Sequence, residues 1–572
     1  MNKSDLKLAC FIVVAGCFSA CTETHETPAP EAADRVFLNG AVYTVDAARP
    51  WSEAVAIAGG RIVFVGDDED AEAYIGDATE VTDLDGQMML PGFHDSHIHI
   101  MIGIADETEC DLLRLETTSV IAQRLKECTQ IAGTDDDNWL VGGGWYEHLW
   151  PEANPRKGLL DAMFPDRPVY LVSSFGHSAW VNSKALEIAG IDADTKDPDA
   201  GRIEHDPETG EPSGTLRDAA MMLVMEKLPP VSIPQQMNRI RAAMDLAHSV
   251  GITAVIEPGL DDELMQPIVN LADLGELDMR MLASMSPINW QPGSFDEDVF
   301  DYLATREQWR RPNINVDSVK IYMDGVIEYG TSPLLEPYED TDYGDGSDWF
   351  FYDQDVVDDY FTRFDAMGLQ IHVHAIGDAA IQRALNGFEA MRVANGPSEN
   401  RHQIVHLQLI HPDDRPRFGE LGVAAVFQSL WAYPDPAALE LDIPMLGEER
   451  TWQMYPIKSV RDAGGRIVGG SDYWVTDLNP LWAIEAAITR QDPHSNDGLV
   501  LNEDERVDLE TMLAAYTING AYQMSLENEQ GSIEVGKRAD LVVLDRNLFD
   551  IPASEISEAN VTMTIFDGRV VY

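Results

Sequence analysis

Short apolar runs rich in β-branched residues recur along most of the chain, and stretches of helical periodicity separate most of them. The eight runs are MMLPGF (88–93), GITAVIEPG (251–259), LDMRMLASM (277–285), VDSVKIYMDG (316–325), LQIHVHAIGD (369–378), RHQIVHLQL (401–409), VAAVFQSL (423–430) and RIVGGSD (466–472). Runs of this length predict buried strands, and the stretches between them predict helices. Eight β/α units predict an α/β fold, a (β/α)8 TIM-like barrel with its active site at the C-terminal strand ends.

Two parts of the chain fall outside this repeat. About 105–250 lies between the first and second runs and exceeds one helix, so we expect an α/β insertion after strand one that caps the site. Residues 34–90 and 525–572 consist of short alternating segments between Gly and Asp turns, which predict strands. We expect them to form one small antiparallel β domain from both ends, beside a barrel over 91–524.

The N-terminal segment has the layout of an export signal. Lys3 and Lys7 precede the apolar run LACFIVVAGCFSA, which is too short to span a membrane comfortably. The sequence FSAC, ending at Cys21, resembles a bacterial lipoprotein cleavage box. Residues 1–21 are therefore predicted to be a signal peptide with lipidation at Cys21, and 22–33 a tether. This indicates a periplasmic protein or one anchored to the outer membrane; an uncleaved anchor predicts the same compartment.

Composition and charge narrow the classes of function. A hydrophobic content of 45% with 43 Gly and 31 Pro is typical of a globular protein of enzyme size. The formal net charge is −60, from 99 acidic and 39 basic side chains, which argues against nucleic-acid binding. Because the acidic excess is spread along the chain, a solvated surface suited to salty water explains it better than a cationic substrate does.

Three of the five cysteines lie in the N-terminal segment. Cys110 and Cys128 remain, and in an oxidising compartment an even pair predicts a disulfide. The alternative is two buried free thiols.

Ionisable residues stand on or at the end of several predicted strands. They are His97, His99, Lys320, His372, His374, His406 and Asp472. Alternate residues of a strand share a face, so His97 and His99 form a chelating pair. Neutral imidazoles with a carboxylate suit a divalent metal that activates water, and Asp472 is placed to move the proton.

The combined motifs resemble the amidohydrolase superfamily, and its amidohydrolase-3 branch in particular, which includes N-substituted formamide deformylases. The resemblance rests on PGFHDSHIH, HSAWVNSKAL (177–186), VKIYMDG, HAIGDAAI (374–381), GSD before NPLWAIEAAITR, and GSIEVGKRADLVVLD. It implies one or two divalent metal ions, with zinc the leading candidate. His97 and His99 would bind the more buried ion and His374 and His406 a second, and a carboxylated Lys320 would bridge them. Asp472 would serve as ligand and proton carrier.

The resemblance also implies residues that contact the substrate. Trp145 would line the pocket, with a core aromatic cluster as the alternative. His177 would be catalytic and polarise the carbonyl oxygen of the substrate, with a helix cap in the insertion as the alternative. Asp324 is a further candidate that equally suits loop fixation, and Tyr329 would lie near the substrate with Glu328. Trp431 and Tyr433 would form an apolar wall or pack ordinarily. Val405 stands where the branch commonly has Glu, so a carboxylate that orients a metal ligand is expected to be missing.

These observations predict a metal-dependent hydrolase of a small N-acyl or N-formyl compound, acting on an amide-like C–N bond other than a peptide bond. An ester, lactone or dipeptide hydrolase on the same site is the alternative within enzymes. A surface lipoprotein that binds ligands without turnover is the alternative of another class. The expected partner is a small-molecule amide, with membrane contact only through the N-terminal segment, and the sequence leaves open a homodimer.

Overall fold

The computed structural model describes residues 30–100, 110–113, 115–131, 139–199, 201–286, 298–339, 350–495 and 498–572. The predicted signal peptide, Cys21 and most of the tether lie outside these ranges. Among the described residues, no helix is both long enough and apolar enough to cross a bilayer.

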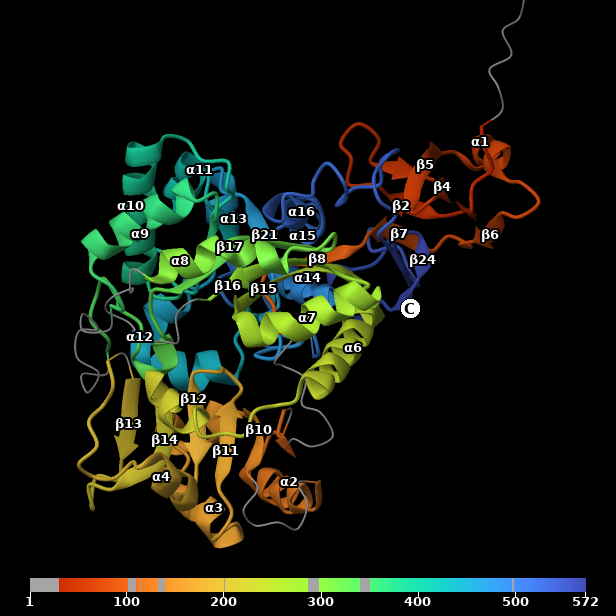
Figure 1. Ribbon diagram of the computed structural model, residues 1–572. Helices are drawn as coiled ribbons and strands as arrows, with labels where there is room; N and C mark the ends of the chain where they lie inside the picture. Colours follow the sequence, from red (N-terminus) through yellow and green to blue (C-terminus); the bar gives the residue numbers. More distant parts are fainter. Residues whose placement is uncertain are drawn as a thin grey trace, which may run out of the picture.

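A parallel eight-stranded barrel forms the centre of the molecule, which confirms the predicted fold (Figure 1). Its strands are β8 (Phe93–Asp95), β15 (Ile252–Leu260), β16 (Arg280–Met285), β17 (Ile314–Tyr322), β18 (Gln370–Ala375), β19 (Gln403–His406), β20 (Ala424–Phe427) and β21 (Ile467–Gly469). They pair in chain order from β8 to β21. The Ser96 N–H donates to the Gly469 carbonyl at 3.0 Å and links the first strand end to the last.

Helices cover the outside of the barrel. They are α6 (Ile233–Ser249), α7 (Asp262–Leu274), α8 (Asp298–Ala304), α9 (Gln354–Ala366), α10 (Asp378–Asn395), α11 (Arg415–Leu421), α13 (Ile457–Asp462) and α14 (Pro480–Thr489). α7 shows how local sequence sets their ends. Asp261 caps it by accepting from the N–H groups of Glu263 and Leu264, and Gly275 ends it at a φ of 73°.

The first predicted strand is divided between two sheets, which corrects the expected run MMLPGF. β7 (Met88–Pro91) belongs to the β domain, and the barrel strand β8 begins only at Phe93. The chain crosses between the sheets at Gly92, where a Cβ would lie 2.3 Å from the Thr253 hydroxyl. A glycine is therefore needed where the two sheets approach each other.

The β domain combines strands from both ends of the described chain. One sheet contains β1 (Arg35–Leu38), β4 (Ala54–Ala58), β5 (Arg61–Gly66) and β6 (Glu80–Asp83). The other contains β2 (Ala41–Tyr43), β3 (Trp51–Ser52), β7, β22 (Leu541–Leu544), β23 (Val561–Phe566) and β24 (Arg569–Val570). The expectation of a purely antiparallel domain is wrong, because β1 pairs with β6 and β2 with β7 in parallel. Parallel pairing needs a crossover, and α1 (Asp68–Ala71) lies on the one that leads to β6.

The insertion folds as a separate mixed sheet with its own helices (orange to yellow in Figure 1). Its strands are β9 (Cys110–Asp111), β10 (Leu140–Trp145), β11 (Val169–Ser173), β12 (Ser178–Val181), β13 (Gly201–His205) and β14 (Pro212–Asp218). Two apolar clusters fill it, one of which contains Cys110 and Cys128. Those cysteines form a disulfide between β9 and α2 (Thr118–Ile131).

Candidate active site

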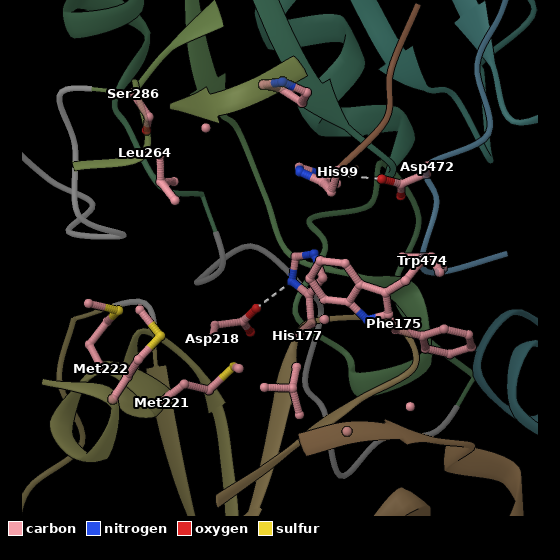
Figure 2. Close-up of a pocket in the computed structure, with 18 of the residues that line it drawn as sticks. His99, Phe175, His177, Asp218, Met221, Met222, Leu264, Ser286, Asp472 and Trp474 are labelled. Atoms are coloured by element: carbon pink, nitrogen blue, oxygen red, sulfur yellow. Dashed lines mark hydrogen bonds and ion pairs between the residues drawn. The ribbon is translucent and has the colours of Figure 1, made fainter. Parts of the chain in front are cut away.

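A cavity of about 570 Å³ lies between the C-terminal ends of the barrel strands and the insertion. The barrel contributes polar side chains to its wall, among them His97, His99, Lys320, Tyr322, His374, His406 and Asp472. The insertion contributes His177, Asp218 and mostly apolar residues, including Met221 and Met222. Figure 2 shows His177 and Asp218 on the insertion side of the cavity and His99 and Asp472 on the barrel side. The strand-end residues and the cap therefore enclose one space.

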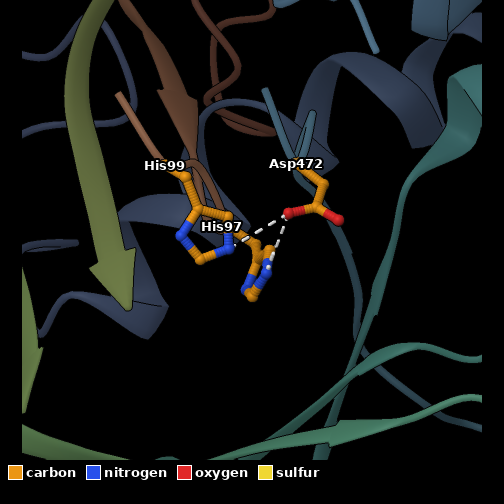
Figure 3. A group of neighbouring side chains, drawn as sticks. All are labelled: His97, His99 and Asp472. Atoms are coloured by element: carbon orange, nitrogen blue, oxygen red, sulfur yellow. Dashed lines mark ion pairs between the residues drawn. The ribbon is translucent and has the colours of Figure 1, made fainter. Parts of the chain in front are cut away.

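His97, His99 and Asp472 converge at the centre of the barrel mouth (Figure 3). Asp472 Oδ1 lies 3.2 Å from His97 Nε2 and 3.3 Å from His99 Nε2, and potential ligand atoms of the three residues all fall within 4.8 Å of one another. His97 is fully buried and Asp472 is 5% exposed. Two imidazoles and a carboxylate at this spacing are a suitable donor set for a divalent cation.

Backbone hydrogen bonds between the first and last strand ends hold this group together. The Asp472 N–H donates to the His97 carbonyl at 2.8 Å, and the His99 N–H donates to the Tyr473 carbonyl at 2.8 Å. Asp472 itself has a φ of 55°, a conformation that turns the chain just after β21. Non-glycine residues at positive φ are uncommon and cluster at functional sites, so this local geometry fits a constrained site.

The other histidines stand close to this triad. The His374 and His406 rings are 4.4 Å apart between centroids, and His406 is 4.9 Å from His97. His374 Nε2 contacts the Gly325 carbonyl at 3.0 Å, which leaves Nδ1 as the ring nitrogen for a metal. His372 instead contacts His97 Nδ1 through Nε2 at 2.7 Å. His372 therefore orients a metal-binding histidine, although it shares a strand face with His374.

Lys320 is buried in the same region, with 1% of its surface exposed. Its ammonium nitrogen has no hydrogen-bond partner among the described residues and lies 4.7 Å from the Tyr322 ring centroid. Burial lowers the pKa of Lys320 to about 7, because an isolated ammonium is costly to desolvate. A substantial fraction of this amine is therefore neutral near physiological pH and available as a nucleophile or for modification.

The protonation states suit metal binding. Burial holds the pKa values of His97, His374 and His406 well below their ordinary value, so these rings are neutral at physiological pH. Burial acts to raise the pKa of Asp472, but the His99 hydrogen bond and the nearby Lys320 ammonium outweigh it and lower that pKa. Neutral imidazoles beside an ionised carboxylate are the forms that bind a metal. His97 Nε2 and Asp472 Oδ1 contact each other but form no hydrogen bond with any group outside the triad in the described part of the chain, which suits a shared cation.

His177 forms a hydrogen-bonded pair with Asp218. The sequence motifs predict His177 as a site residue but not Asp218. His177 Nδ1 donates to Asp218 Oδ1 at 2.7 Å, and both side chains are at least nine-tenths buried. The His177 ring lies 5.3 Å from that of His374, between the insertion and the barrel donors. Asp218 ends β14 at a φ of 45° and lies 41 residues from His177. No local sequence pattern links the two positions, because an antiparallel pairing of β12 with β14 brings them together.

Three predicted substrate contacts lie behind the cavity wall. Trp145 is fully buried in the core of the insertion, where its indole N–H donates to the Leu171 carbonyl at 2.9 Å. Asp324 accepts from the N–H of Gly377 at 2.8 Å and fixes the turn after β18. Tyr329 donates to Glu147 Oε1 at 2.6 Å and joins barrel to insertion. The polar group of each of these three side chains already forms a hydrogen bond within the protein, which explains why it does not face the cavity.

Although Val405 stands where a carboxylate was expected, His406 still has a side chain that orients it. Val405 packs in a small apolar cluster with Val426 and Val468 inside the barrel. The contact to His406 comes from Gln428, whose Oε1 accepts from His406 Nδ1 at 3.0 Å. Trp431 stacks on the His406 ring with ring planes 4° apart. His406 therefore has an orienting partner supplied by β20 and the turn after it.

This barrel and its converging donors define a metal-dependent hydrolase of the amidohydrolase superfamily. The chain belongs to the amidohydrolase family, whose Amidohydro_3 profile matches residues 80–572. It is 31% identical to "Protein LONG AFTER FAR-RED 3" of Arabidopsis thaliana, over 95% of this chain and 92% of that protein. It is 27% identical to the N-substituted formamide deformylase of Arthrobacter pascens, over 94% and 98% of the two chains.

A solved structure shares the fold. It is an uncharacterized metal-dependent hydrolase from Pyrococcus furiosus, 24% identical with a TM-score of 0.67, covering 90% of this chain and 99% of that one.

Proposed function

We propose that this protein hydrolyses the amide-like C–N bond of a small N-acyl or N-formyl compound. The observation that carries the proposal is the convergence of His97, His99, Asp472 and the unpartnered Lys320 at the wall of one enclosed cavity. The relative from Arthrobacter pascens, an N-substituted formamide deformylase, supports an amide as the substrate class.

The barrel donors would hold one or two divalent ions, zinc being our leading candidate. His97, His99 and Asp472 form the first donor set, and His374 and His406 would serve a second ion. Carbon dioxide can add to the neutral amine of Lys320, forming a carbamate that releases one proton and supplies two oxygen ligands. A bound metal of this kind lowers the pKa of water towards about 7 and polarises a carbonyl.

The chain's own residues account for proton transfer and charge stabilisation. Asp472 is ionised, so it can accept a proton from the attacking water and deliver it to the leaving nitrogen. The Asp218 carboxylate accepts from His177 Nδ1–H and fixes the orientation of the ring, as buried carboxylates do for catalytic histidines. When it carries a proton, His177 Nε2 can donate to the carbonyl oxygen as that oxygen gains negative charge.

A substrate panel tests this proposal. Zinc-replete protein is assayed with N-formyl amines, N-acyl amino acids, dipeptides, lactones and esters, with the metal content measured in the same preparation. We expect turnover of formamides or N-acyl compounds that is lost on chelation and restored by added Zn²⁺. Esters or dipeptides hydrolysed at least ten times faster would assign the alternative substrate class. Purified protein without a bound divalent metal, and without rescue by zinc, would leave only a ligand-binding role.

We also propose that the chain is exported and carries a lipid on Cys21. The support is the N-terminal sequence pattern, together with the Cys110–Cys128 disulfide, a bond typical of oxidising compartments. Labelling with a tagged fatty acid should mark the wild-type protein and not Cys21→Ser. Equal labelling of both, or a full-length unprocessed N-terminus in the wild type, would contradict lipidation.

A further inference from the structure

A second, smaller cavity of about 60 Å³ adjoins the metal donors on a different side. It shares part of its wall with the large cavity, namely Phe175, His177, His374, His406, Asp472 and Val475. The rest of its wall includes three carboxylates, Glu328, Asp435 and Asp442, which together we term the carboxylate pocket. A substrate whose scissile bond lies at the metal donors can therefore reach both cavities at once.

Two of the three carboxylates of this pocket have an oxygen without a hydrogen-bond donor. Asp442 is 2% exposed and its Oδ1 has no hydrogen-bond partner among the described residues. Gln408 Nε2 donates to Asp442 Oδ2 at 3.0 Å and reaches Glu328 Oε1 only at 3.4 Å. Glu328 Oε2 is also unpartnered within the described part of the chain. Buried carboxylate oxygens without donors are costly, so this wall suits a ligand that supplies donors.

The described part of the chain places no neutralising cation beside these carboxylates. Among described residues, no lysine or arginine forms an ion pair with Glu328, Asp435 or Asp442, and the charges that act most strongly on Asp442 are those of the other two. Outside the described ranges, the sequence has lysine or arginine only at Lys3, Lys7 and Arg114. Burial raises the pKa of all three carboxyl groups, that of Glu328 to about 7, that of Asp435 to about 6 and that of Asp442 well above its ordinary value, and an arriving cation would favour their ionised forms.

Aromatic side chains complete the wall. Phe175, Trp431 and Tyr455 line the same small cavity, and Trp431 is fixed by its stacking on His406. Aromatic faces beside carboxylates are a favourable setting for an organic cation. The large cavity, by contrast, is lined on the insertion side by apolar residues such as Met221 and Met222.

We propose that the carboxylate pocket binds an ammonium group of the substrate, carried on the opposite side of the scissile amide from an apolar group in the large cavity. This inference rests on the proposed amide hydrolysis and names its substrate class. The substrate is an N-acylated amine with an apolar acyl part and a short, positively charged amine part.

Three matched amides test the inference. They are N-octanoyl-1,4-diaminobutane, the neutral N-octanoyl-pentylamine and the anionic N-octanoyl-4-aminobutanoate, assayed with zinc-replete protein. We expect kcat/KM for the cationic amide to exceed that for the neutral one at least tenfold, with the anionic amide slowest. Asp442→Asn should reduce the ratio of cationic to neutral kcat/KM at least tenfold. Asp413→Asn, which alters a side chain 93% exposed on the surface, should leave the ratio unchanged. Equal rates for cationic and neutral amides, or an unchanged ratio in Asp442→Asn, would overturn the inference.

A binding measurement separates this inference from the proposed function. Calorimetric titration at pH 8 compares n-butylammonium with butan-1-ol on zinc-replete wild type and on Asp442→Asn. Binding of butylammonium by the wild type alone supports the carboxylate pocket even if every amide of the panel resists hydrolysis. Amide hydrolysis without selective butylammonium binding supports the proposed function and overturns this inference. Tight calcium binding that Asp442→Asn abolishes and butylammonium cannot displace would assign the pocket to an inorganic ion and also overturn it.

Discussion

Asp472 is the residue on which metal binding and proton transfer meet. Its Oδ1 contacts both His97 and His99, and its lowered pKa keeps it ionised. An amide in its place keeps the shape and one oxygen donor but cannot accept a proton. We expect Asp472→Asn to fold and retain metal while turnover falls about 100-fold to 10,000-fold, the usual contribution of a general base.

We check this prediction by measuring three properties of the variant: its turnover of the best amide of the panel, its metal content and its circular dichroism. Rates within threefold of the wild type would exclude Asp472 as the proton carrier. Loss of metal together with activity would show that its role as ligand dominates.

Gln428 is expected to set the metal affinity of the second histidine pair. Its Oε1 accepts from His406 Nδ1–H, which leaves Nε2 as the ring nitrogen that would hold a metal. Gln428→Leu removes that acceptor, and loss of such an orienting partner typically weakens metal binding about 10-fold to 100-fold. The effect is measured as the amount of metal that each variant retains as the chelator concentration is raised. Gln428→Glu keeps an acceptor and should retain metal better than Gln428→Leu; equal loss in both variants would contradict the orienting role.

Asp324 should make the stability of the metal-free protein depend on pH. Burial raises its pKa to about 7, above the ordinary value of about 3.9, so the folded state binds the proton more tightly. Its stabilising contribution is then complete below about pH 4 and is lost as pH rises towards 7. Between about pH 5 and 8 we expect a loss on the order of 2–3 kcal/mol.

Urea unfolding of chelator-treated protein at both pH values gives this difference, and Asp324→Asn should remove most of it. An unchanged pH dependence in Asp324→Asn would assign the effect to other groups.

At the scale of single residues, the sequence could predict that the residues at the strand ends form the site. His97, His99 and Asp472 meet because parallel strands end at one side of a barrel, and this rule needs no knowledge of loops. Asp218 and Gln428 could not be predicted in the same way. Their roles depend on the pairing within the insertion and on the turn after β20, and neither leaves a periodic pattern.

At the level of elements, the contact between the insertion and the barrel depends on a buried carboxylate. Glu147 accepts from the Tyr329 hydroxyl at 2.6 Å and from Ser174 Oγ at 2.6 Å. It also accepts from the N–H of Phe175 at 3.2 Å, and Phe175 lines both cavities. Tyr329 thus holds the insertion against the barrel from the short helix η6 (Ile327–Tyr329).

Tyr329→Phe should therefore loosen the cap without touching the chemistry. Losing a hydrogen bond to a buried charged group costs about 1–3 kcal/mol. We expect KM to rise severalfold with kcat nearly unchanged, and amide hydrogen exchange to speed up in β10–β12. Tyr572→Phe, at an exposed tyrosine, is the matched control. A fall in kcat at constant KM would instead indicate direct participation of Tyr329 in the reaction.

Strand positions were predictable and strand partners less so. The seven later runs overlap β15 to β21 because buried parallel strands are continuous apolar segments. β7 and β8 form one apolar run in the sequence, and only the approach of the two sheets at Gly92 divides them. Hydrophobicity identifies a buried segment but does not specify which sheet buries it.

On the scale of the whole molecule, charge is the dominant departure from an average protein. Even if every lysine and arginine paired with one carboxylate, 60 acidic side chains would have no basic partner. The sequence predicted this surface charge from counts alone. It could not predict the carboxylate pocket, because Glu328 is distant in the chain from Asp435 and Asp442 and only the fold separates these three from the solvated majority.

Self-repulsion of this surface should make stability depend on salt. Repulsion among like charges opposes the compact state, and the Debye length shrinks from about 10 Å at 0.1 M to about 3 Å at 1 M ionic strength. We therefore expect the melting temperature to rise by several degrees between about 0.05 M and 1 M NaCl, with most of the rise in the lower half of that range. Tetramethylammonium chloride should give the same rise if screening is the cause, and sucrose at equal osmolality should give no such early rise. A melting temperature that is flat in both salts, or that rises only in sucrose, would show that the charge is already neutralised locally.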